Sequence, residues 1–490
     1  MSITKNYYEE GMHFFQPKIH FQYPNEGKAV SEFPILNYTV AVLWKIFGEH
    51  EFIYRLLEYL ILLCAMFFLY NTIIRFYESV WMALFSASVV LTSPLIAYYG
   101  LNFIVDVPAF SIGLMSFCFG LKFYRTTKLS YFYWALGLGT LAVLMKASAL
   151  MGLSILVLCS LIDILNLNAL FGIHKLFSKK VLPLIFIFIS AVLIAGWYSY
   201  ALYYNGYDNN HVFLLTILPI WDMSGEDFIS SLKQLFNTWF PLFLNRPMFF
   251  LFISLVIFVA ANFRRLDAFL KVAFLGSALF FVTYLLVFFW VFNVHDYYLI
   301  NLMFFPAITL ICLAHILSQS EYGFVNSSFT KIFVVFLVVF NSLHAAAIYR
   351  LRMVEKDPLV SWYPFISKEE IDLEGYLAWV YSNDIKRIEN IKPVLREHGI
   401  KREDKIVSIP DGSFDISLYF MDQKGYTINR DHLINDTTVA DRFFYRNIKY
   451  VVLSDTTLKK ERAFRRIQYK LEPFFVYNNQ VQVFKVKQGL

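Results

Sequence analysis

The stretch YYGLNFIVDVPAF, residues 98–110, is a short polar break between two long apolar runs. The runs, residues 80–99 and 107–123, are each long enough to cross the hydrocarbon core of a bilayer, which takes roughly 20 helical residues. Asp106 is therefore expected at a membrane surface, where a carboxylate is costly unless it is solvated or paired. A structural role is also open, because an acid shortly before Pro108 favours the start of a helix.

The composition excludes an ordinary soluble protein. Of the 490 residues, 58% are hydrophobic and 19% are aromatic, and the mean hydropathy is +0.52. The net charge of +6 is modest and spread over the loops that flank the apolar runs, so it requires no nucleic acid partner. The lipid bilayer is expected to be the main solvent.

Apolar runs end near residue 350 and divide the chain into two regions. Residues 1–350 are expected to form a polytopic α-helical membrane domain of about ten spans, and residues 351–490 a small α/β domain. Residues 1–51 are polar and aromatic and are expected to form a first outer loop with two short helices lying on the membrane, the second over 34–47. The predicted spans are residues 52–75, 80–101, 107–124, 131–145, 148–165, 181–204, 246–262, 267–292, 297–318 and 330–349.

The last 140 residues, 351–490, carry patterns of both helix and strand. Apolar residues at helical spacing predict helices over 384–398 and 416–421, whereas short runs of β-branched residues predict strands over 405–410, 449–453 and 480–486. No glycine-rich phosphate loop and no nucleophile elbow accompany them. This region is expected to pack over the membrane domain.

The distribution of Lys and Arg in the short loops predicts the orientation, because such charges gather on the cytoplasmic side. Alternate loops hold most of them, so the first outer loop, the turn at Asp106, the loop 205–245 and the C-terminal domain are expected to share the outer side. An amphipathic run over 228–240 is expected to lie at that interface. The cytoplasmic set comprises Arg75, Lys122, Arg125, Lys128, Lys175, Lys179, Lys180, Arg264, Arg265 and Lys331.

Acidic and basic side chains gather in these outer segments. They suit chemistry on a phosphate-linked lipid, because an acid can accept a proton from an attacking hydroxyl and a cation can neutralise a phosphate leaving group. Two structural readings stay open: Lys146 as a lysine that snorkels to the interface, and His295-Asp296 as a polar cap of the next span. The set comprises Glu32, Asp106, Lys146, His211, Arg246, His295 and Asp296.

The order of five short segments resembles the GT-C class of integral-membrane glycosyltransferases, above all the bacterial branch related to protein O-mannosyltransferases and to the aminoarabinose transferase of lipid A. The likeness covers residues 1 to about 350 and, more loosely, the C-terminal domain. The segments are SEFPILNY at 31–38, GEHEFIYRL at 48–56, the turn at Asp106, LAVLMK at 141–146, and HDYY at 295–298 followed by Pro306.

This resemblance implies a polyprenyl-phosphate sugar donor and transfer to an acceptor hydroxyl on a lipid, glycan or protein, at the outer face of the inner membrane and with inversion at the anomeric carbon. Asp106 matches the acid of the second outer loop and is the expected catalytic residue. Glu32 matches the acid of a Glu-x-Pro segment, which lies near the donor phosphate or a divalent metal cation. The expected donor-phosphate set is Glu32, Lys146, Arg246, His295 and Tyr297, and the candidate metal ligands are Glu32 and His211.

The beginning of the chain departs from the family pattern. In the family a first span and an acid thought to be the catalytic base precede a segment like ITKNYY, residues 3–8, and this chain starts inside that segment. Glu9 and Glu10 lie about two helical turns further on and are not expected to substitute. The polar N-terminus and the otherwise complete topology favour a start codon read downstream of the true one. The alternative is that this copy has lost its base and is impaired.

Taken together, these observations predict a polytopic membrane glycosyltransferase with a GT-C-like fold. Two alternatives belong to other classes: an impaired protein that binds lipid-linked sugar without turnover, and a transporter or lipid flippase. Transporters usually show internal repeats and charged or broken helices at mid-membrane. The sequence shows no clear repeat, and its polar groups gather at one face instead.

Overall fold

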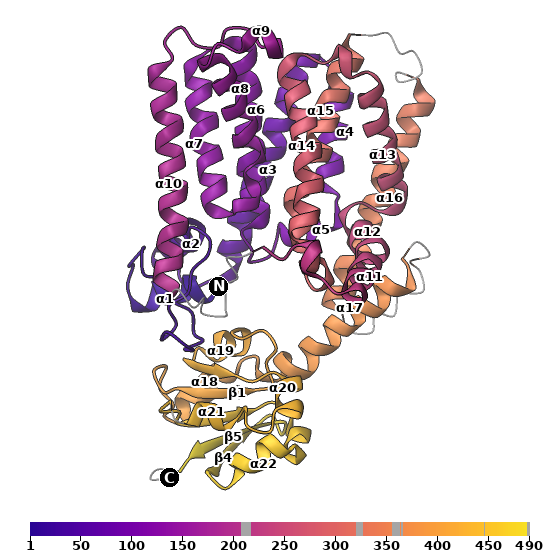
Figure 1. Ribbon diagram of the computed structural model, residues 1–490. Helices are drawn as coiled ribbons and strands as arrows, with labels where there is room; N and C mark the ends of the chain where they lie inside the picture. Colours follow the sequence, from indigo (N-terminus) through magenta and orange to yellow (C-terminus); the bar gives the residue numbers. More distant parts are fainter. Residues whose placement is uncertain (207–216, 320–326, 355–362, 364–365, 445, 488–490) are drawn as a thin grey trace.

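The computed structural model describes residues 1–206, 217–319, 327–354, 363, 366–444 and 446–487. Figure 1 shows a bundle of long helices with a small mixed domain attached at one end. The N-terminus lies at the end of the bundle that faces this domain, and the C-terminus lies at its far side. The predicted architecture of a helical membrane part followed by a small α/β part is confirmed.

Helices occupy all ten predicted span positions. Within the described residues, six are long and apolar enough to cross a membrane, or seven if the pair Gly225–Phe243 and Arg246–Ala261, bent by 88°, counts as one span. The predicted spans that fall short of this length are formed by shorter apolar helices, among them Val80–Leu91, Leu129–Met145 and Met151–Ile164. The helices are α3 Glu51–Tyr77, α4 Val80–Leu91, α5 Pro94–Tyr99, α6 Asp106–Thr126, α7 Leu129–Met145, α8 Met151–Ile164, α9 Asn168–Phe171, α10 Val181–Asn205, α13 Arg246–Ala261, α14 Ala268–Val287, α15 Phe304–Ser318 and α16 Ser328–Met353.

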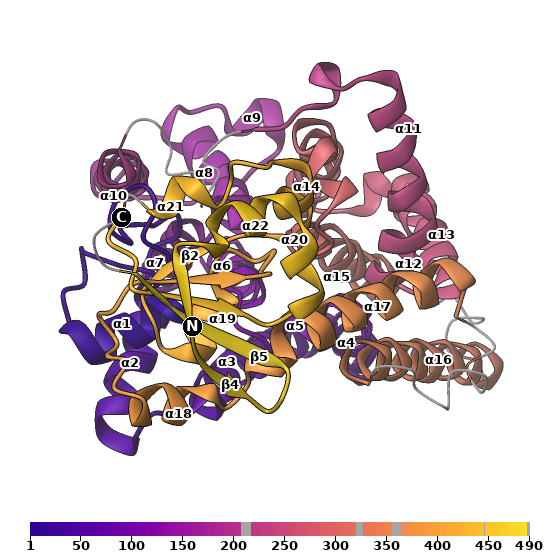
Figure 2. The same cartoon turned by 90° about the horizontal axis from the view of Figure 1, so that it is seen from below.

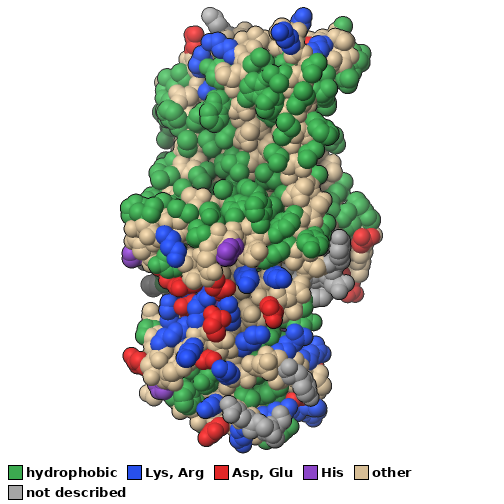
Figure 3. Space-filling model, turned by 90° about the vertical axis from the view of Figure 1, so that its left-hand side faces the viewer, with side chains coloured by type: hydrophobic (Ala, Val, Ile, Leu, Met, Phe, Trp, Pro, Cys, Tyr) green, Lys and Arg blue, Asp and Glu red, His purple; other side chains and the backbone are tan. Residues whose placement is uncertain are grey.

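Helix α6 lies at the centre of the bundle. In an apolar stretch of 18 residues in α6, 89% of the residues are buried inside the protein, and in Tyr297–Ser318 the share is 94%. In the other four long helices it is only 22% to 33%. Those outer helices therefore face lipid, and Figure 3 shows hydrophobic side chains covering this part of the molecule. Helix α8 approaches α6 closely at Gly152, where a Cβ would lie 2.5 Å from the carbonyl oxygen of Gly113.

Short helices lie at the end of the bundle that faces the C-terminal domain (Figure 1). The first loop contains α1 Ser2–Glu10 and α2 Ile35–Phe47, which matches the expected pair of helices. The amphipathic run predicted over 228–240 forms α11 Gly225–Gln234, a π-helical turn Leu235–Trp239 and α12 Phe240–Phe243.

The C-terminal domain contains a five-stranded mixed sheet in the order β2-β1-β3-β5-β4. Strand β1 pairs in parallel with β2 and β3, whereas β5 runs antiparallel to β3 and β4. The three predicted strands and the helix over 416–421 are confirmed. A single helix over 384–398 is wrong, because Asn390 adopts a left-handed conformation (φ +59°) and the helix begins after it. The elements are α17 Lys368–Val380, α18 Ile391–Glu397, β1 Ile406–Ile409, α19 Ile416–Met421, β2 Gly425–Thr427, α20 Arg430–Asn435, α21 Asp441–Phe444, β3 Tyr450–Leu453, α22 Arg462–Gln468, β4 Leu471–Tyr477 and β5 Val481–Val486.

The first loop closes the edge of this sheet beside β2. Phe21 forms a parallel bridge with Gly425. The Gly425 amide donates to the His20 carbonyl at 3.1 Å, and the Gln22 amide donates to the Gly425 carbonyl at 2.8 Å. On its other side Gly425 pairs with β1, where a Cβ would lie 2.0 Å from the Ile406 carbonyl oxygen, so the pairing of β1 with β2 requires glycine here. An edge that would otherwise expose its backbone groups is thus covered by the chain itself.

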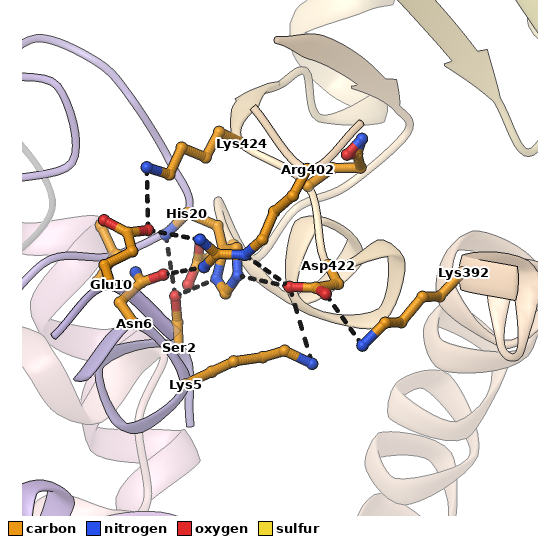
Figure 4. Close-up of polar contacts among 12 residues, drawn as sticks. Ser2, Lys5, Asn6, Glu10, His20, Lys392, Arg402, Asp422 and Lys424 are labelled. Carbon is orange, nitrogen blue, oxygen red and sulfur yellow. Dashed lines mark hydrogen bonds and ion pairs between the residues drawn. The ribbon is translucent and has the colours of Figure 1, made fainter. Parts of the chain in front are cut away.

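An ion-pair cluster centred on Asp422 holds the same two parts together (Figure 4). Its carboxylate lies 3.0 Å from Arg402 Nε and 3.0 Å from Lys392 Nζ of its own domain, and 3.8 Å from Lys5 Nζ of α1. Arg402 also donates to Glu10 Oε1 of α1 at 2.7 Å. Burial opposes the charge of Asp422, but its neighbours outweigh burial and hold the pKa of this carboxyl well below its ordinary value. The domain is therefore docked on the first loop by charge as well as by strand pairing.

Acid is expected to weaken this docking through His20. The imidazole is fully buried, and burial lowers its pKa from 6.5 to about 4, despite Asp422 at 3.7 Å. Below pH 6.5 the imidazole is protonated in the unfolded chain, whereas in the folded chain it stays neutral down to about pH 4. Protonation therefore favours the unfolded chain, and the stability of the protein falls as the pH drops from 6.5 to about 4. Thermal unfolding of the full chain at pH 7 and pH 5 measures the effect. The variant His20→Gln should show a smaller difference between the two, and an equal difference in both proteins would contradict this role.

Candidate functional site

Three charged side chains that are far apart in the sequence meet at the end of the bundle near the C-terminal domain. Asp106 is the first residue of α6, Glu32 precedes α2, and Lys146 follows the last residue of α7. The Lys146 ammonium lies 3.2 Å from Glu32 Oε1 and 3.4 Å from Asp106 Oδ2. The structure therefore brings together three of the residues predicted from the sequence.

Aromatic rings cover this triad. Lys146 Nζ lies 5.9 Å from the ring centre of Tyr297 and 5.4 Å from that of Tyr298, within the range of cation–π attraction. The His295 ring packs against Tyr297, with their centres 5.1 Å apart. Asn301, in the 3₁₀ segment Tyr297–Met303, donates to the Ser148 hydroxyl at 2.8 Å, which fixes this segment against the turn after Lys146. His295 and Tyr297 thus lie near the triad, as predicted, and Tyr298 joins them.

The Asp106 carboxylate has one oxygen without a partner. The residue is 2% exposed, Oδ2 faces Lys146, and Oδ1 is buried with no hydrogen bond within the described structure. Asp106 stands in the first turn of α6, two residues before Pro108, so the expected acid at a helix start is confirmed, and this position is compatible with a chemical role. A buried carboxylate oxygen beside a cation can accept a proton from a hydroxyl placed against it.

The charges around the triad are set by Lys146. Burial opposes the charge of Glu32, but Lys146 and the hydroxyl of Ser31 outweigh it and hold the pKa of Glu32 below its ordinary value. Burial lowers the pKa of His295, and this imidazole is therefore neutral at neutral pH. The site at pH 7 contains a cation between carboxylates, with a neutral imidazole and tyrosines beside it.

Two predicted residues are not brought to this cluster. Arg246 is the first residue of α13, its side chain is exposed, and the structure records no contact between it and the triad. His211 lies outside the described residues. Their predicted roles in donor and metal binding stay predictions.

A divalent cation does not fit the described residues of this site. Glu32 and Asp106 are both held by the Lys146 ammonium, which takes the place that a metal ion between them would need. Across the described parts of the chain, no group of three His, Cys, Asp or Glu side chains is arranged to hold a metal.

Sequence reasoning missed the buried arginine that supports the aromatic segment. Arg352, near the end of α16, donates to Asp296 Oδ2 at 2.7 Å and to Glu374 Oε2 of α17 at 2.8 Å. Asp296 also accepts a hydrogen bond from the Tyr99 hydroxyl at 2.6 Å. Asp296 therefore occupies the N-cap position of the segment Tyr297–Met303, but its carboxylate is held by side-chain partners and makes no capping hydrogen bond. The available signal was an arginine at the end of the last apolar run, next to a predicted domain boundary.

Replacing Arg352 with glutamine should strongly destabilise the protein. The change leaves Asp296 and Glu374 buried without their shared cation, and breaking such a pair costs about 3–5 kcal/mol. Thermal unfolding in detergent measures the loss. Arg350→Gln, at an exposed position two residues earlier on the same helix, is the control and should cost less than about 1 kcal/mol. Equal stability of the two variants would show that the buried pairs contribute little.

Comparisons with known proteins bear on this arrangement. The profile of the family described as dolichyl-phosphate-mannose-protein mannosyltransferase matches residues 31–168, which include the whole triad. The crystal structure of ArnT from Cupriavidus metallidurans in the apo state superposes with a TM-score of 0.55 and 12% identity, covering 99% of this chain and 92% of that chain. The crystal structure of ArnT from the same organism bound to undecaprenyl phosphate superposes with a TM-score of 0.53, and its identity and coverage are the same. A search of curated proteins finds no match.

A third structure, the arabinofuranosyltransferase AftD from Mycobacteria, covers 92% of this chain and 35% of its own, with 10% identity and a TM-score of 0.49. The likeness to ArnT spans nearly the whole chain and concerns the fold, since identity is low. It agrees with the matched profile and with the apolar helices. The predicted resemblance is thereby confirmed: the chain is an integral membrane protein with the fold of the GT-C glycosyltransferases.

Proposed function

We propose that this protein is a glycosyltransferase that moves a sugar from a polyprenyl-phosphate donor to a hydroxyl of an acceptor, with inversion at the anomeric carbon. The matched profile is described by a dolichyl-phosphate-mannose donor, and ArnT, which shares the fold, has been crystallised with undecaprenyl phosphate. Both support a donor in which the sugar is joined to a lipid through phosphate. The acceptor is a lipid, glycan or protein that presents a hydroxyl group.

The observation that carries this proposal is the position of Lys146 between Glu32 and Asp106. One ammonium faces two carboxylates, and Asp106 Oδ1 is buried beside it with no hydrogen-bond partner among the described residues. Sugar transfer from a phosphate needs a base for the attacking hydroxyl and a cation for the leaving phosphate. The triad supplies both within a few ångströms, which a purely structural ion pair does not require.

Asp106 and Lys146 have separate roles in the proposed reaction. The acceptor oxygen attacks the anomeric carbon and the bond from that carbon to the phosphate oxygen breaks, so the electron pair leaves with polyprenyl phosphate. Asp106 accepts the acceptor's hydroxyl proton at Oδ1. Lys146 neutralises the charge that develops on the phosphate. Attack from the side opposite the phosphate inverts the anomeric carbon.

The other predicted residues are assigned to donor binding. Glu32 holds the Lys146 ammonium in place at 3.2 Å, while Tyr297 and neutral His295 provide a face on which a sugar ring can stack. Arg246 is proposed as a second contact for the donor phosphate. We also propose that the site and the C-terminal domain face the outer side of the inner membrane, on the basis of the charges in the opposite loops.

The test uses the full chain in nanodiscs of neutral lipid with a lipid extract of the membranes in which the protein occurs. Release of free polyprenyl phosphate and formation of a glycosylated product, both followed by mass spectrometry, are expected whichever sugar is carried. Binding of the donor without release of polyprenyl phosphate would contradict the proposal and favour a protein that only binds lipid-linked sugar. Movement of the donor across the bilayer without transfer would favour a flippase.

A further inference from the structure

The most basic segment of the C-terminal domain is TTLKKERAFRRIQYK, residues 456–470. It carries six cationic side chains and one carboxylate, Glu461, whereas the whole chain has a net charge of +6. The helix α22 lies within this segment, and its apolar residues Ala463, Phe464 and Ile467 are buried in the domain core. The opposite face of α22 is therefore fixed toward solvent by the packing of the helix.

Three arginines gather on that exposed face. Arg462, Arg465 and Arg466 are exposed and, with Thr437, line a shallow hollow of about 460 Å³. Their spacing of three and four residues places them side by side on the helix, where like charges repel. Arg466 pairs with Asp441 at 3.2 Å, whereas no ion pair is recorded for Arg462 or Arg465 within the described residues. The hollow thus has more positive charge than its own acids balance.

The basic residues on the opposite side of the same domain behave differently. Lys392, Arg402 and Lys424 face the first loop, and each lies within 3.0 Å of a carboxylate of Asp422 or Glu10. Their charges serve the docking of the domain and are neutralised there. The arginines of α22 differ from these residues, because Arg462 and Arg465 have no recorded ion pair within the described residues.

The position of α22 favours a partner other than the membrane around the helical bundle. Figures 1 and 2 show α22 on the side of the domain away from the helical bundle, facing the viewer when the molecule is seen from below. Lipid headgroups around the bundle lie at the other side of the domain. An anionic partner has to reach this face from the aqueous phase.

We infer that the α22 hollow, lined by Thr437, Arg462, Arg465 and Arg466, binds a polyanionic polymer bearing phosphate or carboxylate groups. Guanidinium groups match both anions with paired hydrogen bonds, and the Thr437 hydroxyl offers one more donor. Successive charges along a polymer would engage the neighbouring arginines together, which relieves their mutual repulsion. A dense positive patch of this kind also accelerates encounter with a polyanion. This site lies apart from the triad and does not depend on the proposed transfer reaction.

The experiment measures binding of polyphosphate and of polygalacturonate to the full chain in nanodiscs of phosphatidylcholine, at low and at physiological ionic strength. The variant R462Q/R465Q/R466Q is compared with K368Q/K386Q/K401Q, which removes three exposed lysines from other parts of the C-terminal region. The arginine variant should bind at least about tenfold more weakly than the wild type, because three charge-assisted contacts are lost. The lysine variant should stay within about twofold, because it keeps the patch. The polymer that binds more tightly shows whether the site prefers phosphate or carboxylate groups.

Three outcomes would overturn the inference. Equal weakening in both variants would show that the overall charge attracts the polymer and that α22 is no site. If neither polymer binds the wild type at low ionic strength, α22 is also no binding site for a polyanion. Vesicles containing phosphatidylglycerol that bind the arginines in preference to either polymer would assign the patch to a membrane surface. Because all six positions are exposed, unchanged thermal unfolding is expected and verifies that the variants are folded.

Discussion

Replacing Asp106 with asparagine should abolish sugar transfer while the protein stays folded. The amide keeps the size of the side chain but cannot accept the proton of the acceptor hydroxyl, and loss of a general base lowers rates by about 10² to 10⁴-fold. Lys146 retains Glu32 at 3.2 Å as a partner, so the buried ammonium is not left unpaired. The rate of polyprenyl phosphate release is the measurement. Binding of undecaprenyl phosphate should be retained or strengthened, because a negative charge near the phosphate has been removed.

The matched control is Asp163→Asn. Asp163 is a buried carboxylate on a membrane helix as well, and it accepts hydrogen bonds from the Phe177 amide and from Asn168. It lies near the end of α8 beside α9, at the opposite end of the bundle from the triad (Figure 1). This variant should lose stability without losing the transfer step. Normal turnover by the Asp106 variant would exclude Asp106 as the base.

The positions of the helices were predictable because long apolar runs admit few alternatives in a membrane. The sequence also carried the signal for one error: Pro94 breaks the predicted span 80–101 into α4 and α5, since proline cannot continue the hydrogen-bond ladder.

Helical spacing favours pairing of Arg55 with a glutamate one turn away. The structure instead places Arg55 Nη1 2.7 Å from the Leu101 carbonyl and its guanidinium 4.2 Å over Phe103. Tertiary contacts outweighed the local ones.

The sequence was sufficient to predict which residues belong to the candidate site, but not how they are arranged in space. The order of the segments indicated that Glu32, Asp106 and Lys146 share one side of the membrane. Their convergence on one ammonium depends on the packing of α6 and α7 and on the path of the first loop, which no local pattern encodes. The same reason hides the link from Arg352 to Asp296, because it joins the last span to a turn 56 residues earlier. The docking of residues 20–22 on β2 spans an even longer separation.

Replacing Lys146 with glutamine should impair both donor binding and transfer. The ammonium is the cation nearest to the place where phosphate charge develops, and removing one such group costs about 10² to 10³-fold in rate. Lys146→Arg should retain part of the activity, since the positive charge remains. The measurements are affinity for undecaprenyl phosphate and the rate of its release from the sugar donor. Lys233→Gln, at an exposed position on α11 at the same end of the bundle, is the control.

The same substitution should change the pH dependence of stability, which separates loss of a charge from loss of packing. In the native protein Lys146 holds the pKa of Glu32 below its ordinary value. Without the ammonium, the carboxylates of Glu32 and Asp106 face a buried site with no cation, so the folded state takes up a proton more readily than the unfolded state. Stability of the variant should therefore rise as the pH falls from 7 toward 5, relative to the control. If the two proteins respond to pH alike, the carboxylates do not share the lysine as the geometry implies, and the assignment of Lys146 to the phosphate loses its electrostatic basis.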